Sequence, residues 1–431
     1  MSSGTPSKLV EQKIASLTRQ FFANHPDVKL VAVTGSAGKA STKLAIATLL
    51  SKQYNVQLRE QEPLTKTDVF LQIMGVMMPE SGFFRWRKVI KALRKRVEAP
   101  QSGVHVIVQE FDPREIGYNG WFRQYLVPDL TVVTSVQNGR MEVDYPVEAV
   151  AQEMITLANN SRAAIINRDD VDGRFASFLT NPHITTYGST PMAEYRFDQH
   201  KFTLAEGYKG VLITPEDEAG IPLTVRLIGE HNLRPSMAAV AVADSLGMDK
   251  SKIAEGIEAL RPLPGRMNIL PGADGSWLID DSYSSTPSTA LAALQMLYSI
   301  EAPQRIAVLG NMNGLKGVYE VAHADLGSRC SPDLLDWVVT VGAKANQHLA
   351  PAARKRGCQV KECIDAVEAG AFVRGKLMED GIALFKGSSG GVWLEEAIKL
   401  NLRSLSDESQ LVRQDDATLE RKKSFFTSIR G

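Results

Sequence analysis

The sequence lacks an excess of charge of either sign, because 49 lysines and arginines balance 49 aspartates and glutamates. No overall field therefore favours nucleic acid or a membrane surface as a partner. Cysteine is scarce, and three residues without a CxxC pair are typical of a reduced cytoplasmic setting. No apolar run approaches the ~18 residues of a membrane span, and the polar N-terminus has no signal-peptide core. We expect a soluble intracellular protein, and its 431 residues suffice for two or three domains.

One stretch is typical of a phosphate-binding loop. The apolar run 29–34 predicts a buried strand, Gly35-Ser36-Ala37-Gly38 predicts a turn, and a helical pattern begins at Lys39. Amide groups at the start of a helix, together with a lysine, attract phosphate. The usual pattern has a glycine at position 33 and a hydroxyl residue directly after the lysine, whereas this chain has Val33 and Ala40. The stretch therefore fits either phosphate binding or a purely structural turn.

Strand and helix patterns alternate along the first half of the chain. Helices are expected over 9–24 and 232–247, strands at 104–109, 130–136 and 163–167, and a small antiparallel sheet between 184 and 228. Such alternation is typical of a parallel sheet with both faces covered by helices. Ligands of these sheets bind beyond the carboxyl ends of the strands, where Glu110, Ser135 and Asn167 fall.

A proline-rich linker at 260–265 precedes a second α/β pattern. Its strands are expected at 277–280, 305–309, 337–341 and 382–386. We therefore predict one α/β domain over 1–263 and a second over 264–431. The charged residues 406–431 predict a mobile or peripheral helical tail.

A strongly basic segment follows the aromatic residues Phe83, Phe84 and Trp86. An apolar stripe within it predicts a surface helix over about 85–96. The basic face of this helix is either simply solvated or a contact for an anionic partner, such as a lipid headgroup, a polyphosphate or a lipid-linked acceptor. Its cations are Arg85, Arg87, Lys88, Lys91, Arg94, Lys95 and Arg96.

Six segments in order resemble the Mur ligase family, the ATP-dependent amide ligases of peptidoglycan precursor synthesis, and above all its D-alanyl-D-alanine-adding branch. The resemblance covers nearly the whole chain and implies a central ATPase-like domain followed by a Rossmann-like domain. The segments are Thr34-Gly-Ser-Ala-Gly-Lys39, Val106-Ile-Val-Gln-Glu110, Gly229-Glu-His231-Asn232 with Ala238-Ala239, Pro264-Gly265-Arg266, Asp280-Asp281-Ser282-Tyr283 with Pro287, and Val308-Leu-Gly310 followed by Lys386-Gly387-Ser388.

The resemblance implies a role for each of these segments in the first domain. A carboxylate of the substrate attacks the γ-phosphate of ATP, and an amine then attacks the resulting acyl phosphate. Such chemistry needs positive charge around the phosphate oxygens. Lys39 and the backbone of Gly35–Gly38 would hold the phosphates, Glu110 would bind Mg²⁺, and His231 with Asn232 would lie near the adenine.

In the second domain, the resemblance implies that Arg266 and Asp281 contact the phosphates and ribose, while Tyr283 lines the same cleft. Lys386, at the end of a strand, would hold the substrate carboxylate or the acyl phosphate. Closure of the two domains would exclude water from this reactive intermediate.

The departures from the family concern its metal ligands. Ala40 stands where a hydroxyl residue binds Mg²⁺, and Ser41, the remaining candidate, is rotated by about 100° around the helix. Arg140 replaces a metal-binding histidine, and no lysine between Lys95 and Lys201 is present to be carbamylated. Either the guanidinium of Arg140 replaces a second divalent cation, or the chain is a catalytically degenerate homologue.

The resemblance also implies the reaction partners: a cell-wall peptide precursor and an amino acid or dipeptide, with ATP and Mg²⁺ as cofactors. Only a short helix precedes the phosphate loop, where cell-wall members of the family carry a domain for the UDP-sugar. The leading hypothesis is an amide ligase without that domain. The alternative is a nucleotide-binding or scaffold protein with a protein partner, and a folate or poly-amino-acid ligase is a third hypothesis.

Overall fold

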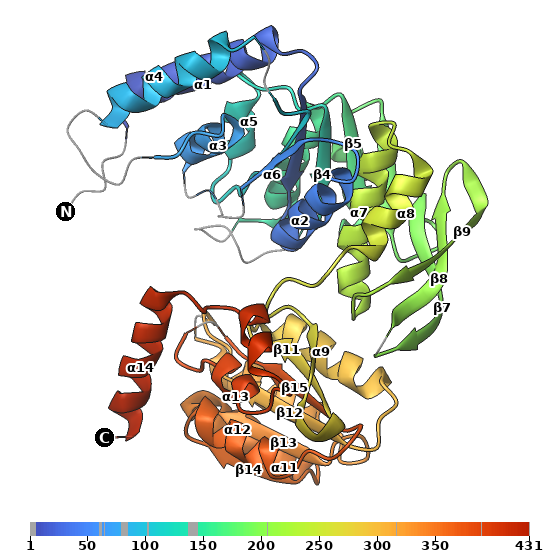
Figure 1. Cartoon of the computed structure of the whole chain (residues 1–431), viewed down its shortest axis with the longest axis vertical. Coiled ribbons are helices and arrows are strands. Elements are labelled where there is room, and N and C mark those ends of the chain that lie inside the picture. Colours follow the sequence, from blue (N-terminus) through green and yellow to red (C-terminus); the bar gives the residue numbers. More distant parts are fainter. Residues whose placement is uncertain are drawn as a thin grey trace. The chain divides into compact units, whose positions relative to one another are not determined.

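The computed structural model describes residues 6–59, 63, 65–78, 85–100, 103–136, 145–204, 206–315, 317–388 and 390–430, and for Glu230, His231 and Arg430 the backbone alone. The chain divides into two compact units (Figure 1). Unit 1 consists of Met1–Phe202, Glu206–Arg226 and Glu230–Leu260, and unit 2 of Thr203–Ala205, Leu227–Gly229 and Arg261–Gly431.

Unit 1 is built on a nine-stranded sheet of order β2-β3-β1-β4-β5-β6-β7-β8-β9. The strands from β2 to β6 pair in parallel, as the alternation of strand and helix patterns predicts. Their central members read as continuous apolar runs because both faces of the sheet are covered. These strands are β1 (Lys29–Thr34), β2 (Val56–Leu58), β3 (Val106–Glu110), β4 (Leu130–Val133), β5 (Ala163–Asn167) and β6 (Ile184–Gly188).

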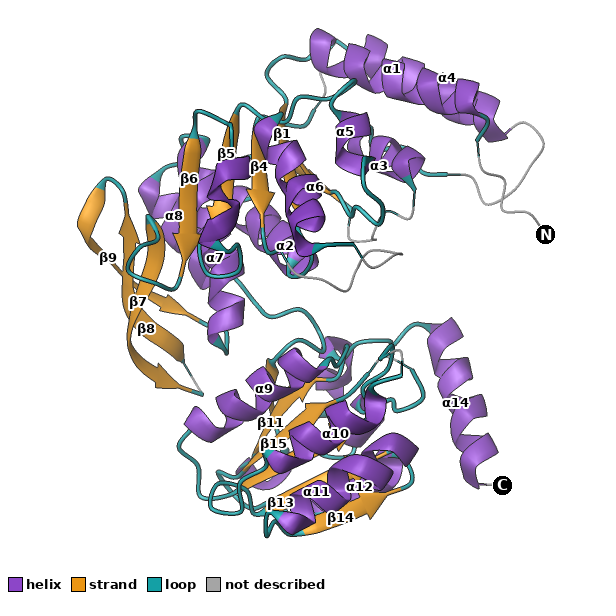
Figure 2. Cartoon of the chain, turned by 180° about the vertical axis from the view of Figure 1, so that it is seen from behind, coloured by secondary structure: helices purple, strands orange, loops and turns teal. Residues whose placement is uncertain are grey.

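The strands expected between 184 and 228 are present, but they do not form a separate sheet. β6 pairs in parallel with β5 and with β7 (Tyr195–Thr203), and β8 (Gly207–Thr214) pairs antiparallel with β9 (Asp217–Val225). All of them extend the edge of the nine-stranded sheet, as Figure 2 shows on its left side. The expected antiparallel pairing is confirmed for β8 and β9, whereas its continuity with the parallel strands was not predicted, because alternation within a strand does not reveal the partner strand.

Helices cover both faces of this sheet. One hydrophobic core joins Leu30 and Ala32 of β1 to α1, α3, α4 and α5, and α1 lies beside α4 in both views of the chain. On the other face, α2 packs against α7 and α8. The helices are α1 (Lys8–Asn24), α2 (Lys39–Leu50), α3 (Lys66–Ile73), α4 (Arg85–Glu98), α5 (Tyr118–Phe122), α6 (Val147–Asn159), α7 (Glu230–Ser245) and α8 (Lys250–Glu258), with a 3-10 turn at Gly173–Phe178.

Unit 2 contains a six-stranded sheet of order β10-β11-β15-β12-β13-β14, in which only the β10–β11 pair is antiparallel. Its hydrophobic core lies between these strands and the helices α12 and α13. The strands are β10 (Asn268–Pro271), β11 (Trp277–Asp281), β12 (Arg305–Gly310), β13 (Trp337–Val341), β14 (Val360–Cys363) and β15 (Ile382–Lys386). The helices are α9 (Pro287–Ser299), α10 (Tyr319–Ser328), α11 (Ala350–Lys355), α12 (Ala366–Arg374), α13 (Glu395–Lys399) and α14 (Asp416–Arg430), with shorter turns at Ala273–Gly275, Ala345–Leu349 and Leu405–Gln410.

The charged C-terminal segment is helical, as expected, but it is anchored to unit 2. Leu411, Val412, Thr418 and Lys422 are all buried there. Composition alone indicated a mobile or peripheral helical tail, because the charges that hold the segment also make it hydrophilic. In the part of the chain that the structure describes, no helix is both long and apolar enough to cross a bilayer.

Candidate functional site

The loop after β1 has the backbone geometry of a tight strand-to-helix turn. Gly35 has a φ of 134°, and a Cβ atom there would clash with the Thr134 hydroxyl and lie 2.9 Å from the Ser135 nitrogen. Gly38 has a φ of 81° and precedes α2 without a side chain to cap it. The amides of the first turn of α2 are therefore not satisfied by a cap side chain, which leaves an N-terminus suited to an anion.

Residues at the end of the neighbouring strand hold this loop in place. The amide of Ser36 donates to the Ser135 carbonyl over 3.0 Å, and the amide of Ala37 donates to the Ser135 hydroxyl over 2.8 Å. The Thr134 hydroxyl donates to the Ala37 carbonyl. The sequence placed Ser135 at a strand end but did not indicate that it binds the loop, a contact that depends on the pairing of β1 with β4.

Lys39 is buried in a cluster of two cations and two carboxylates. Its Nζ atom lies 2.7 Å from Asp112 Oδ1 and 4.0 Å from Glu110 Oε1, and it donates to the Gly35 carbonyl over 2.8 Å. Lys43, one helical turn further along α2, places Nζ 3.3 Å from Glu110 Oε2. All four side chains are at most 5% exposed, so mutual pairing is what makes their burial tolerable.

Two members of this cluster, Asp112 and Lys43, were missed at the level of the sequence. Lys43 had a signal, because residues four apart lie on one face of a helix. Asp112 follows the end of β3 by two residues, and β3 pairs directly with β1, so that Val33 lies opposite Glu110. The register of this parallel pair brings both carboxylates beside the loop.

The donor set beside the loop fits a hard divalent cation. Neither carboxylate oxygen of Glu110 accepts a hydrogen bond from any described residue, although the side chain is buried and lies near two lysines. Glu110 and Asp112 offer oxygen ligands of the kind that Mg²⁺ prefers. No described group of three His, Cys, Asp or Glu residues is arranged around a metal position. Phosphate oxygens and water would therefore have to complete the coordination.

The helix α6 contacts β1 through Met154 and α5 through Glu153. The Met154 sulfur accepts a hydrogen bond from the Thr34 hydroxyl over 3.7 Å. The neighbouring Glu153 accepts the amides of Gly117 and Asn119 over 2.7 and 2.6 Å, and burial raises the pKa of its carboxyl group despite these bonds. Glu153 thus holds α5 rather than a ligand. Arg140 lies outside the described residues, as do its immediate neighbours.

The residues expected near the adenine lie at the start of α7. His231 and Asn232 belong to its first turn; Asn232 is half-buried, and the side chain of His231 lies outside the described structure. Arg234 of the same helix forms ion pairs with Asp169 and Asp170 over 3.0 and 2.8 Å. This pairing ties α7 to the segment that follows β5.

In unit 2, the expected residues form two contacting pairs. Asp281 and Lys386 lie opposite each other in the β11–β15 register, with 2.9 Å between Oδ2 and Nζ, and Lys386 also donates to the Ser284 carbonyl. The guanidinium of Arg266 lies 4.2 Å from the centre of the Tyr283 ring, which is partly exposed. Such stacking contributes about 0.5–1 kcal/mol at an exposed site and orients both groups.

Asp280 fixes the turns that carry these pairs. Its fully buried carboxylate accepts the Gly265 amide over 3.1 Å, and the Ser282 amide and hydroxyl over 3.1 and 2.6 Å. Burial raises the pKa of Asp280 to about 6, against the opposing effect of the bonds from Ser282. A Cβ atom at Gly265, where φ is 71°, would lie 2.6 Å from Val412 and 2.9 Å from the Tyr283 nitrogen.

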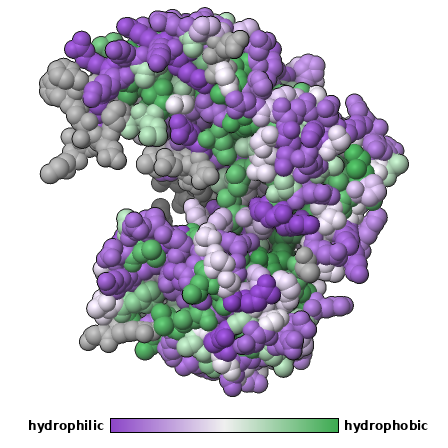
Figure 3. Space-filling view, in the orientation of Figure 1, coloured by the Kyte–Doolittle hydropathy of each residue, from purple (hydrophilic) through white to green (hydrophobic). Residues whose placement is uncertain are grey.

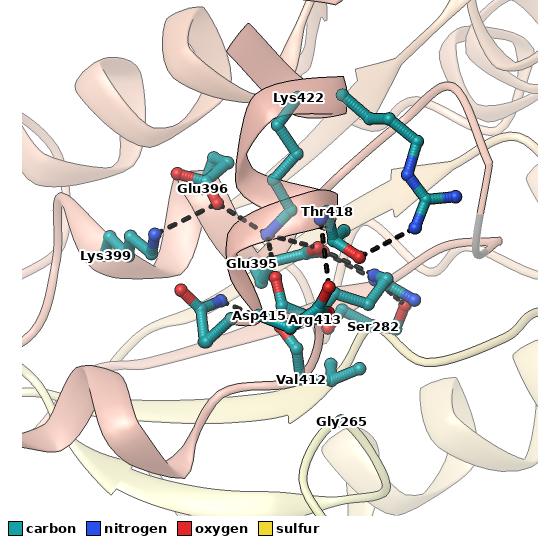
Figure 4. A network of polar contacts seen from close by, with 12 residues as sticks. Gly265, Ser282, Glu395, Glu396, Lys399, Val412, Arg413, Asp415, Thr418 and Lys422 are labelled. Atoms are coloured by element: carbon teal, nitrogen blue, oxygen red, sulfur yellow. Dashed lines mark hydrogen bonds and ion pairs between the residues drawn. The ribbon is translucent and has the colours of Figure 1, made fainter. Parts of the chain in front are cut away.

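The C-terminal segment contacts the turn that contains Ser282 and Tyr283 (Figure 4). Arg413 donates to the carbonyls of Ser282 and Tyr283 over 2.9 and 3.1 Å, and it forms a two-bond ion pair with Glu395. Lys422 of α14 reaches Glu395 as well, over 2.9 Å. Burial alone would raise the pKa of Glu395, but the bonds and charges of Arg413 and Lys422 outweigh burial and hold it below its ordinary value.

The structure therefore brings several of the expected residues together, in one group in unit 1 and in two pairs in unit 2. In unit 1, Lys39 and Glu110 lie beside the glycine loop, and Ser41 is half-buried in the first turn of α2. In unit 2, Asp281 contacts Lys386, and Arg266 contacts Tyr283.

Comparison with known proteins identifies the family of this chain. The Mur ligase middle domain matches residues 33–243, and the Mur ligase, glutamate ligase domain matches 265–389. The UDP-N-acetylmuramoyl-tripeptide–D-alanyl-D-alanine ligase of Bacillus subtilis is 25% identical over 91% of this chain and 80% of its own length. The UDP-N-acetylmuramoyl-L-alanine–L-glutamate ligase of Xanthomonas campestris is 33% identical over 88% of this chain and 70% of its own length.

A solved structure shares the fold. The MurF ligase of Thermotoga maritima, in complex with ADP, has a TM-score of 0.67 at 16% identity and covers 93% of this chain, which in turn covers 86% of that structure. The two domain matches, together with the 33% identity to the Xanthomonas campestris ligase, decide the family, and the resemblance inferred from six sequence segments is confirmed. The chain belongs to the Mur ligase family.

Proposed function

We propose that this chain is an ATP-dependent carboxylate–amine ligase that acts on a peptide precursor of the cell wall. The observation that carries the proposal is the buried pairing of Lys39 with Asp112 and Glu110 beside a glycine loop at the carboxyl end of β1. Charged groups are buried at a strand end at a considerable cost in solvation, so this cluster is more readily explained by a ligand than by stability.

The residues of unit 1 would act on the nucleotide. The first turn of α2 and Lys39 would hold the β- and γ-phosphates once Lys39 exchanges Asp112 for a phosphate oxygen. Glu110 and Asp112 would hold Mg²⁺, which when bound neutralises charge on the phosphate oxygens. A substrate carboxylate oxygen would then attack the γ-phosphorus as ADP leaves, and an amine would attack the acyl carbon as phosphate leaves.

Unit 2 would contribute the groups that contact the bound substrates. Lys386 carries a positive charge suited to the carboxylate or the acyl phosphate, and Asp281 holds its ammonium group in place. Arg266, Asp281 and Tyr283 would contact the nucleotide, and Arg140 would replace a second cation. The ADP in the Thermotoga maritima structure and the substrates that the names of the two relatives give support ATP, a muramoyl peptide and an amino acid or dipeptide as the ligand classes.

A specific observation favours a second candidate, a homologue that binds nucleotide without turnover. Ala40 lacks the hydroxyl that follows the lysine in the usual loop, and no lysine between Lys95 and Lys201 is present to be carbamylated. Two metal ligands of an active site would then be absent. Such a protein would serve as a scaffold and would bind a protein partner.

Calorimetric titration of ADP, with and without Mg²⁺, tests the proposal. We expect micromolar binding that depends on Mg²⁺ and weakens at least tenfold in Lys39→Met/Asp112→Asn, because a charge-assisted hydrogen bond contributes about 1.5–3 kcal/mol. The double variant removes both charges, so that no unpaired charge is left buried. Lys52→Met, which affects the exposed pair with Glu255 just beyond α2, is the matched control.

Release of phosphate separates the two candidates. An active ligase releases phosphate from ATP only when a muramoyl tripeptide and D-alanyl-D-alanine are both present, and Glu110→Gln abolishes the release. ADP binding without any release supports the scaffold instead. The absence of nucleotide binding overturns both, and binding that is independent of Mg²⁺ favours Arg140 as the replacing cation.

A further inference from the structure

The basic helix α4 carries the strongest concentration of charge in the described part of the chain that the proposed reaction does not use. Seven of its 14 residues are arginine or lysine, and Glu98 at its end is the one acidic residue. The chain as a whole is neutral, so these cations represent a local excess rather than a general property.

The cations occupy the side of α4 that faces away from the protein. Val89, Leu93 and Val97 form its buried stripe and pack against the core that α4 shares with α1. The exposed arc lies opposite this stripe, and in Figure 3 hydrophilic side chains cover the α1–α4 layer at the top of the view. The exposed cations are Arg87, Lys88, Lys91, Arg94 and Lys95.

Most of these charges are not neutralised within the protein. No carboxylate of the described residues forms an ion pair with Lys88, Lys91, Arg94 or Lys95. Three exposed lysines elsewhere in unit 1 are paired by contrast: Lys209 with Glu206 over 2.8 Å, Lys250 with Glu216 and Lys252 with Glu255.

The arrangement also weakens the helix that carries it. The first turn of α4 contains Arg85, Arg87 and Lys88 and no acidic residue, although the positive end of the helix dipole favours acidic residues there. Like charges at spacings of three and four, such as Lys88, Lys91 and Lys95, cost about 0.2–0.5 kcal/mol a pair. A merely solvated face would be more stable with charges of both signs.

We propose that the exposed face of α4 is a docking surface for an anionic phospholipid membrane. A membrane surface offers a plane of negative headgroups, and α4 offers a row of exposed cations from Arg87 to Lys95, about 12 Å long at 1.5 Å per residue. The apolar stripe is already buried in the core, so the contact is electrostatic and includes no insertion of the helix. A single-stranded nucleic acid fits less well, because Trp86, the aromatic residue of α4, is partly buried against the core and is not among the exposed residues of the arc.

The inference is independent of the ligase proposal, since adsorption to a membrane requires no turnover. Sedimentation of the full chain with vesicles tests it directly. We expect the protein to pellet with vesicles of phosphatidylcholine and phosphatidylglycerol, to remain in solution with pure phosphatidylcholine, and to dissociate in high salt. Lys88→Gln/Lys91→Gln/Lys95→Gln should weaken the partitioning about 100-fold, at roughly fivefold for each basic residue near the surface.

The matched control is Lys209→Gln/Lys250→Gln/Lys252→Gln, which removes the same charge from paired lysines of the same unit. Circular dichroism checks that both variants fold. Equal vesicle binding by the two triple variants would overturn the assignment to α4. The proposal would also fail if the wild-type protein did not pellet with anionic vesicles. Tighter binding to a duplex oligonucleotide or to inorganic polyphosphate than to the vesicles would overturn the choice of a membrane.

Discussion

At the scale of single residues, the buried carboxyl group of Asp280 makes the stability of unit 2 depend on pH. Burial raises its pKa to about 6 from an ordinary value of 3.8, so the folded state binds the proton more tightly than the unfolded chain does. The stability that this group contributes is therefore complete below about pH 4 and is lost as the pH rises through about 6. At about 1.4 kcal/mol for each pH unit, the loss amounts to about 3 kcal/mol.

Comparison with Asp280→Asn, which does not titrate, isolates this effect. The unfolding free energy of the wild type relative to the variant should fall by up to about 3 kcal/mol between pH 4 and pH 7. Urea unfolding followed by the fluorescence of the tryptophans is the measurement, and Trp277 lies on the same strand. Asp333→Asn, at an exposed position of unit 2, serves as the control, and a pH-independent difference for Asp280→Asn would contradict the assignment.

Single residues also show how much of the candidate site could be predicted from the sequence. Lys39 and the glycine loop were predictable because the turn is encoded in contiguous residues, and Glu110 was predictable as a polar residue at a strand end. Asp112 and Ser135 contact the loop across 73 and 98 positions of the chain, through the register of β3 and β4 with β1. Register is set by packing over the whole sheet, so no local pattern carries that information.

At the scale of elements, the C-terminal helix α14 is part of unit 2 because two cations anchor it to a buried carboxylate. Arg413→Ala would leave Glu395, which has no exposed surface, with Lys422 alone and would free two backbone carbonyls. We expect a loss of about 3 kcal/mol of stability, since breaking a buried ion pair typically costs 3–5 kcal/mol. Urea unfolding, together with faster tryptic cleavage after Arg403 and within Arg421–Lys423, is the readout.

Arg354→Ala is the matched control for this prediction, because it breaks an ion pair with Glu362 in which both side chains are exposed. Exposed pairs contribute about 0–1 kcal/mol, so this variant should unfold nearly as the wild type does. Arg413→Lys should recover part of the lost stability, since it restores the charge without the two-bond geometry. Equal losses in Arg413→Ala and Arg354→Ala would show that the C-terminal segment is not anchored as described.

Helices and strands were predicted where the periodic pattern of apolar residues was strong, and they were missed where the element was short. The helix over 9–24 and the strands of both central sheets are confirmed, because each buries a complete face or a complete run. The edge strands β10 and β14, of four residues each, were missed. Short edge strands bury little apolar surface and therefore leave a weak pattern in the sequence.

At the scale of the whole molecule, the two units have separate hydrophobic cores, one within residues 14–157 and another within 270–411. We therefore expect two transitions in thermal unfolding. Arg413→Ala, which lies in unit 2, should lower the midpoint of only one of them and thereby identify it. The α/β class of both units follows from alternation in the sequence, whereas the extent of the larger sheet depends on strand pairing that alternation does not encode.

Saturation with ADP and Mg²⁺ then tests which unit holds the nucleotide. A ligand at 100 times its dissociation constant stabilises the state that binds it by about 2.7 kcal/mol, so the midpoint of unit 1 should rise through contacts with Lys39 and its loop. If Arg266, Asp281 and Tyr283 contact the same nucleotide, the midpoint of unit 2 should rise as well, and we expect both. If only the midpoint of unit 1 rises, those three residues do not contact the nucleotide, whereas the assignment of Lys39 to the nucleotide site still holds. The absence of any rise would contradict nucleotide binding itself.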